Sequence, residues 1–258
     1  MIEKPFYEIS IRASICFFDI QVNNVSLISM NVKGQVSFPL PLNYLILESG
    51  LQEISVRIAP TLGDIILDED TNFSCELKLF NSDDKAQPIE TVAKYEIDKA
   101  ILKTGIPVIE HKIKFNAKVP YKLLAWQNSI DLETVSNVRG LVEGFYKKIN
   151  LLIATKQYDA FIELLSEREK NMTVSMYLSN EESKNRMNGL IEDFENGFKL
   201  APLSFDDFLI YFSDNRVVKI VKKDMDSALR FFNKDTGEEM SLDVLFQMKQ
   251  DSKELSII

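Results

Sequence analysis

The chain has very little histidine: His111 is the only one among 258 residues. This scarcity excludes metal sites that need two histidines, and any histidine-based catalytic relay would have to use this one imidazole. Within residues 110–119, alternation places His111 on the apolar face with Ile113 and Phe115. We therefore expect His111 at the rim of a core, without a catalytic role.

Cysteine is scarce as well. The two cysteines, Cys16 and Cys75, fit a reducing compartment. Unbroken alternation along residues 7–18 places Cys16 on the polar face with Ser10, whereas Cys75 shares the apolar face of Phe73. We expect Cys16 to face solvent and Cys75 to face the core, so that no disulfide joins them.

The nine glycines are scattered, and none belongs to a phosphate-binding loop. The chain lacks the glycine-flanked serine of hydrolases, the glycine pattern of dinucleotide-binding folds and the P-loop. No activated nucleophile can be placed beside His111 either. The sequence favours a protein that is not an enzyme and uses no cofactor, and it offers no catalytic, cofactor-binding or metal-binding residue.

Basic patches are also absent. The formal net charge is -9, and both halves are acidic, with 13 Lys and Arg against 16 Asp and Glu up to Ala125, and 17 against 23 beyond it. This balance excludes the basic surface that attracts nucleic acids and anionic membranes. No apolar run approaches the roughly 20 residues of a membrane-spanning helix, and no leader peptide is recognisable, so we expect a cytoplasmic protein.

Carboxylates are plentiful, but their spacing does not predict a metal site. Residues 68–72 place oxygen ligands at alternate positions, as calcium-binding loops do. Phe73, however, stands where such a loop needs glycine, and Leu79 stands where it needs a bidentate glutamate. We expect solvated turns here and at residues 206–207, and a solvated helix face for the glutamates at residues 163–169.

Two-residue alternation dominates the first 120 residues. It predicts short strands at residues 6–18, 25–32, 35–40, 53–60, 73–80, 89–97 and 108–119. Asn23-Asn24 and residues 33–34 are typical of hairpin turns, and Pro39 and Pro41 should end the pairing because proline has no N–H. The spacing of strands and turns predicts an antiparallel β-sandwich.

The apolar period changes to three and four between residues 130 and 197. It predicts helices over residues 132–153, 158–169 and 173–194, the first of them capped by Ser129 or Asp131. Gly140 and Gly144 lie four residues apart on the first helix, where we expect close packing against a neighbouring element. Gly197 occupies the usual position of a C-terminal cap.

Strand signals return after Pro202. Residues 208–212 and 216–221 flank a turn at residues 213–215, and both arms of this hairpin are apolar on both faces, so both should be covered. Further strands are expected at residues 227–232 and 255–258. The predicted fold class is mixed α and β: an antiparallel β-sandwich domain over residues 1–125, then an α+β domain over residues 126–258 in which three helices precede a small antiparallel sheet.

Three helices followed by a meander resemble, in element order, the cone-shaped fold of nuclear transport factor 2-like and cystatin-like proteins. This resemblance implies a pocket between helices and sheet, which such proteins use for catalysis, ligand binding or dimerisation. Separately, Pro41-Leu42-Asn43 ahead of Gly50 and a short β run resembles the accessory β-sandwich domains of glycoside-processing enzymes. That resemblance implies carbohydrate binding.

Aromatic side chains supply the candidate contact residues. Trp126 and Tyr121 lie at the expected junction of the two domains, where they either join the halves or form an aromatic platform for a ligand. Tyr211 lies on the C-terminal hairpin and would line a pocket there. These three residues are the predicted interdomain or ligand contacts.

Together these features favour a non-enzymatic cytosolic recognition protein whose acidic surface binds another protein. One form is an immunity or inhibitor protein that neutralises a basic toxin or enzyme by charge complementarity, and another is self-association. A small-ligand binder or enzyme that uses a pocket between helices and sheet of the C-terminal domain is the alternative. A carbohydrate-binding β-sandwich is the second alternative, and neither nucleic acid nor membrane is expected as a partner.

Overall fold

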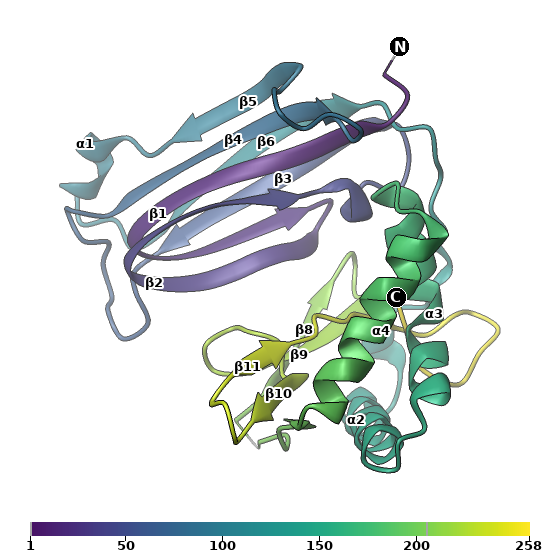
Figure 1. Cartoon of the computed structure of the whole chain (residues 1–258). Helices are drawn as coiled ribbons and strands as arrows, with labels where there is room; N and C mark the ends of the chain where they lie inside the picture. The colour runs from purple at the N-terminus through teal and green to yellow at the C-terminus, as the bar shows by residue number, and fades with distance from the viewer. Residues whose placement is uncertain (1, 205) are drawn as a thin grey trace. The chain divides into compact units, whose positions relative to one another are not determined.

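In a computed structural model, which describes residues 2–204 and 206–258, the chain folds into two compact units. The first comprises the residues up to Leu123 together with Ser175–Tyr177, and the second comprises Leu124–Val174 and Leu178–Ile258. Antiparallel strands dominate the first unit, whereas the second combines helices with short antiparallel strands (Figure 1). The expected mixed α and β fold class is confirmed.

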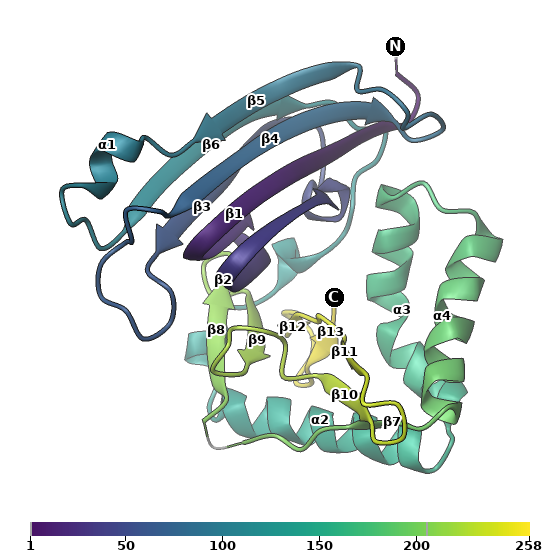
Figure 2. The same cartoon turned by 60° about the vertical axis from the view of Figure 1, so that its left-hand side comes forward.

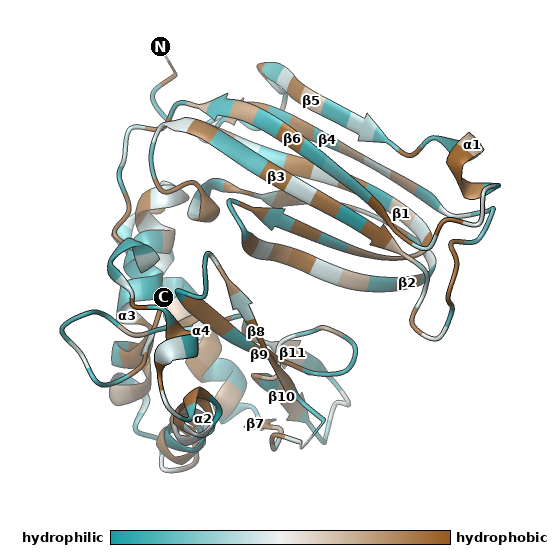
Figure 3. Ribbon diagram, turned by 180° about the vertical axis from the view of Figure 1, so that it is seen from behind, coloured by the Kyte–Doolittle hydropathy of each residue, from teal (hydrophilic) through white to brown (hydrophobic). Residues whose placement is uncertain are grey.

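One six-stranded antiparallel sheet, bent until it is nearly closed, forms the first unit. Its strands are β1 (Pro5–Val22), β2 (Val25–Pro41), β3 (Gly50–Ala59), β4 (Asn72–Asn81), β5 (Glu90–Glu96) and β6 (Ile109–Ala117), in the order β5-β4-β1-β3-β6 with β2 also on β1. The short helices η1 (Asn43–Leu45) and α1 (Lys99–Leu102) connect strands. Hydrophilic and hydrophobic residues alternate along the strands, as a sheet with one buried face requires (Figure 3).

The central strand β1 pairs with strands in both halves of this sheet. One of its edges pairs with β2 along almost the whole strand. On the other edge, β4 pairs with residues 5–14 and β3 pairs with residues 17–22. Two strands can follow one another along the same edge only if β1 bends between them, and the bend brings the two halves around a shared core.

The bend lies at Ile15, whose φ of 49° is in the left-handed region that a β-branched residue rarely adopts. The pairing with β2 passes from Ser14 opposite Gln35 to Cys16 opposite Val32, so Ile15 lies opposite the two residues 33–34 of β2, and this mismatch is a bulge. Buried positions are odd-numbered before the bulge and even-numbered after it. Cys16 is therefore fully buried, and the prediction that it faces solvent is wrong. Both cysteines are buried and free.

The partner strand β2 corrects two further predictions. It is continuous from Val25 to Pro41, so residues 33–34 do not form a hairpin turn but are the two-residue side of the bulge opposite Ile15. Pro39 and Pro41 remain in register with β1. Among the described strands, β2 pairs only with β1, so its other edge is unpaired. A proline is tolerated on such an edge strand, because its missing N–H breaks no hydrogen bond when it faces the unpaired edge. The predicted turn at residues 23–24 is confirmed by two positive φ values, 52° and 61°.

The second unit begins with two 3-10 helices, η2 (Trp126–Asn128) and η3 (Leu132–Thr134), followed by α2 (Val138–Ala154), α3 (Tyr158–Ser175) and α4 (Asn180–Glu195). The first long helix starts later than predicted because Asn137 caps it, whereas Asp131 caps η3. The Asn137 Oδ1 accepts a hydrogen bond from the Gly140 N–H at 3.2 Å. A Cβ on Gly140 would collide with the Asn137 side chain, and Gly144 faces open space, so the expected helix packing at these glycines is wrong.

The third helix also starts later than predicted. Ser179 and Glu182 form a capping box, in which each side chain accepts from the other's backbone N–H, and α4 begins at Asn180. Gly197 follows α4 with a φ of 105°, and its N–H donates to the Phe194 carbonyl, which confirms the predicted cap. None of the described helices is both long and apolar enough to cross a membrane.

Glu169 on α3 is buried, contrary to the prediction of a solvated helix face. Its Oε1 accepts hydrogen bonds from the Ser183 hydroxyl at 3.0 Å and from the Arg186 Nε at 3.2 Å, and these bonds tie α3 to α4. Glu167 forms an ion pair with Lys249 at 2.8 Å. Glu167 and Glu169 therefore have structural partners, whereas Glu163 is exposed as predicted.

Two small antiparallel sheets complete the second unit (Figure 2). One consists of β7 (Phe198–Leu200), β10 (Arg230–Asn233) and β11 (Glu239–Ser241), and the other of β8 (Phe208–Phe212), β9 (Val217–Val221), β12 (Phe246–Gln247) and β13 (Ser256–Ile257). The predicted hairpin and the predicted C-terminal strand are both confirmed, as β8–β9 and β13. All five residues of β9 are buried, as its apolar faces indicated, but only Phe212 is buried in β8, so the prediction that both arms are covered is wrong for β8.

We predict that neither thiol reacts with Ellman's reagent in the native protein at pH 8. Burial raises the pKa of Cys16 to about 11 and that of Cys75 to about 12, so almost no thiolate is present at that pH. Both thiols should react once the chain is unfolded in guanidinium chloride. Arg12→Cys adds a thiol on the exposed face of β1 and should react in the native state. Rapid reaction of the native wild-type protein would contradict the bulge.

Candidate functional site

The three aromatic residues predicted as contacts have structural partners of their own. Tyr121, in the first unit, donates a hydrogen bond to the Asn43 carbonyl at 3.0 Å, and burial raises its pKa. In the second unit, Trp126 is buried in η2, and Tyr211 lies half-buried in β8, where burial also raises its pKa. None of the three lines the cavity or the loop described below. Their contact role stays a prediction.

His111 lies half-buried in β6 and stacks on Tyr95, with ring centroids 3.9 Å apart and planes 8° from parallel. This is the rim position that the sequence predicted. In the described part of the chain, no group of three or more His, Cys, Asp or Glu side chains could hold a metal ion. The run at residues 68–72 forms a turn in which the Asp70 N–H donates to the Asp68 carboxylate at 2.7 Å.

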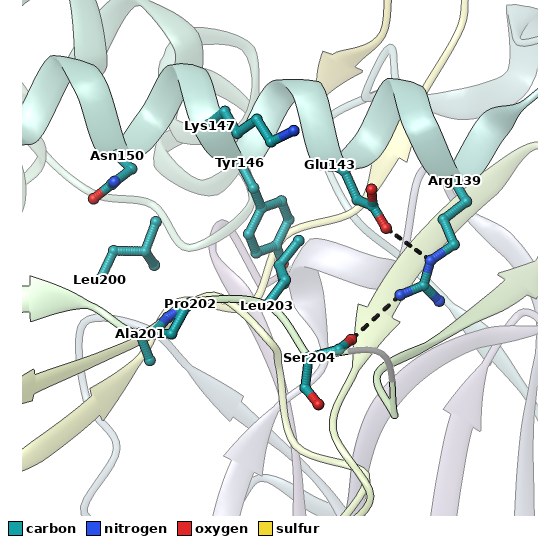
Figure 4. A pocket seen from close by; sticks show the side chains of 10 residues that line it. All are labelled: Arg139, Glu143, Tyr146, Lys147, Asn150, Leu200, Ala201, Pro202, Leu203 and Ser204. Carbon is teal, nitrogen blue, oxygen red and sulfur yellow. Dashed lines mark hydrogen bonds and ion pairs between the residues drawn. The ribbon is translucent and has the colours of Figure 1, made fainter.

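A cavity of about 400 Å³ lies in the second unit between α2 and the segment after β7 (Figure 4). One face of α2 supplies Arg139, Glu143, Tyr146, Lys147 and Asn150, which follow one another at helical spacing. The opposite wall is the segment 200–204, in which Pro202 prevents a regular strand from continuing. The volume falls within the range of small-molecule sites.

Arg139 fixes one end of this cavity. Its Nε donates to the Glu143 carboxylate at 2.8 Å, and its two terminal nitrogens donate to the Asp207 carbonyl at 2.5 Å and the Ser204 carbonyl at 3.3 Å. The guanidinium thus joins α2 to the opposite wall, and three of its five N–H groups are already used in these hydrogen bonds. Its charge is balanced by Glu143.

Tyr146 forms the floor of the cavity and is 3% exposed. Burial, together with the negative charges of Asp243 and Asp207, holds the pKa of its hydroxyl well above the ordinary range, although a hydrogen bond with Ser227 acts in the opposite direction. The Ser227 hydroxyl also donates to the Leu242 carbonyl at 2.9 Å. Tyr146 therefore stays neutral and presents an aromatic ring to the cavity.

Two buried charged residues lie near this floor. Asp207 is 3% exposed, accepts from the Ser204 N–H at 2.7 Å and lies 3.6 Å from the Lys222 ammonium, so the prediction of a solvated turn is wrong for this residue. Lys219, on the fully buried strand β9, pairs with Asp243 at 2.8 Å. The signal for Lys219 is present in the sequence, because a lysine inside an apolar strand needs a partner.

The second candidate site is the loop between β3 and β4 in the first unit, residues 60–71. Leu62, Ile65 and Ile66 are 48%, 84% and 53% exposed, whereas Leu67 is buried. The loop also carries four carboxylates and no basic residue. Large aliphatic side chains grouped on a loop in this way are a common feature of protein-binding surfaces.

Hydrogen bonds hold this loop in one conformation. The Leu62 N–H donates to the Asn31 side chain at 2.8 Å, and the Leu67 N–H donates to the Ile106 carbonyl at 3.2 Å. The Thr61 hydroxyl donates to the Asp64 carboxylate. The exposed side chains at its tip are therefore carried by a backbone that is fixed on both sides.

We predict that Tyr146→Phe lowers the free energy of unfolding by about 1 kcal/mol, because the buried hydroxyl loses its polar interaction with Ser227. Tyr146→Ala should lower the free energy of unfolding by roughly 3–5 kcal/mol, because removal of the whole ring also leaves an empty space in the core. Urea denaturation measures both values. Tyr158→Phe is the matched control, because no hydrogen bond of its hydroxyl is found among the described residues. Equal effects of the two Tyr→Phe changes would contradict the buried network.

Comparison with protein-family models, with curated proteins and with solved structures gave no match. Two features of the described residues are candidate binding sites: the cavity beside α2 and the exposed apolar β3–β4 loop.

Proposed function

We propose that the protein is a non-enzymatic recognition protein that binds another protein through the β3–β4 loop. The observation that carries this proposal is the tip of the loop, where Leu62, Ile65 and Ile66 are exposed on a hydrogen-bonded backbone. Fully burying one such side chain against a partner contributes about 1.5–3 kcal/mol to the free energy of binding. The fixed backbone adds to this because little loop entropy is lost on binding.

The negative charge of the loop indicates which kind of partner would fit it. Asp64, Asp68, Glu69 and Asp70 surround the apolar tip, and all four are exposed. A partner with an apolar pocket and a basic rim would complement both features, and the charges would speed its association at low salt. An inhibitor or immunity protein directed against a basic enzyme or toxin has these requirements. Two unpaired buried thiols support placing this role in the cytoplasm.

Site-specific photocrosslinking tests the proposal in the cells that naturally produce the protein. With p-benzoylphenylalanine in place of Ile65, we expect one crosslinked adduct with a basic protein, weakened as salt rises. Leu51 is the control position, because it is 66% exposed but lies on β3 rather than on the loop. The double change Ile65→Asp with Ile66→Asp should weaken binding of the captured partner at least tenfold.

The same double change should leave the free energy of unfolding within about 0.5 kcal/mol of wild type, because both side chains are exposed. Lost binding can then be assigned to the surface and not to unfolding. Adducts that form equally from positions 51 and 65, or no adduct from position 65, would refute the proposal. A crosslink to a second copy of the chain would identify self-association through the loop.

A further inference from the structure

The cavity beside α2 lies in a different unit from the β3–β4 loop, and it carries an inference that is independent of the proposed function. We propose that this cavity binds a small amphiphile with one carboxylate head and an apolar tail. The proposal uses three properties of the lining: an apolar wall, a single unpaired cation and a nearby carboxylate.

The wall opposite α2 suits the tail. Leu200 and Leu203 direct aliphatic side chains toward α2, Ala201 and Pro202 also line the cavity, and the ring of Tyr146 closes its floor (Figure 4). The Ala201 N–H is already bonded to the Arg230 carbonyl at 2.8 Å, and Pro202 has no N–H. This wall therefore offers few donors, and an alkyl chain or an aromatic body would bury against it without leaving polar groups unpaired.

Lys147 and Asn150 provide the polar groups that would bind the carboxylate head. They lie on the same side of α2, and within the part of the chain that the structure describes neither side chain has a hydrogen-bond or ion-pair partner (Figure 4). Arg139 already uses its guanidinium on Glu143 and two carbonyls. The Lys147 ammonium thus supplies the charge that a ligand can pair with, and the Asn150 amide supplies a second donor.

Glu143 restricts the charge of the head. Its carboxylate lies on the same wall, one turn before Lys147. Arg139 and Glu143 balance one another, so the Lys147 ammonium can balance a monoanion, whereas a dianion such as a phosphate monoester would keep an unbalanced negative charge next to Glu143. A carboxylate is therefore the head that this lining fits, and neutral or cationic heads lose the pairing with Lys147.

Three ligands with the same ten-carbon tail test the head preference: decanoate, decanol and decyltrimethylammonium. In calorimetric titrations of the full chain below the micellar range, decanoate should bind one-to-one. Decanol should bind at least tenfold more weakly, since it lacks the charge, and decyltrimethylammonium more weakly still. No binding of decanoate, or equal binding of all three ligands, would overturn the proposal.

Matched variants test the site. Lys147→Gln should reduce decanoate affinity about tenfold and leave decanol affinity unchanged, whereas Lys148→Gln, the same change at the next position of α2, should leave both unchanged. Leu203→Trp, which enlarges a side chain that is directed toward α2, should weaken the binding of every ligand. Equal effects of Lys147→Gln and Lys148→Gln would refute the assignment of the head.

Methyl NMR locates the tail without a substitution. Decanoate should shift the methyl resonances of Leu200 and Leu203, which line the cavity. Leu151, on α2 but 59% exposed and outside the cavity lining, serves as the control and should not shift. Shifts at Leu151 without shifts at Leu200 and Leu203 would overturn the proposal even if decanoate binds.

Discussion

The left-handed conformation of Ile15 is the constraint on which the first unit depends. It lets β1 exchange one neighbour for another along the same edge, and it moves the inward face from odd to even positions. A positive φ at a β-branched residue costs on the order of 1–3 kcal/mol. Burial on both sides of the bulge offsets this cost, because Ile9 and Ile11 before it and Phe18 and Ile20 after it are all 0% exposed.

In the second unit, one helix performs two tasks. The side of α2 that carries Val142, Tyr146 and Ile149 joins the hydrophobic core, and Tyr146 also lines the cavity together with Arg139. The polar groups behind the cavity are satisfied by partners within the unit: Tyr146 by Ser227, and Arg139 by Glu143 and two carbonyls. Because these bonds already exist without a ligand, the cavity is preformed, and a ligand would not have to assemble it.

Periodicity predicts the element types well, since two-residue and three-to-four-residue patterns report which face is buried. It cannot place the bulge, because Ile15 is not a glycine or asparagine, the residues that usually mark a positive φ. It also cannot separate Ile66, which is exposed, from Leu67, which is buried, because that difference arises from the contact with Ile106 far along the chain. The position of Tyr146 in the cavity cannot be predicted for a similar reason, because its helical spacing is that of an ordinary core residue.

Thr71 connects the β3–β4 loop to the bend in β1. It is fully buried, its hydroxyl donates to the Ile15 carbonyl at 2.7 Å, and its own carbonyl accepts from the Lys99 ammonium at 2.7 Å. Loop and bend are thus mechanically one piece, so force applied at the tip is transmitted to the point where the sheet curves. In the proposed binding role of the loop, a change in this curvature would move the loop, so substitutions at Ile15 or Thr71 would alter the residence time of a bound partner.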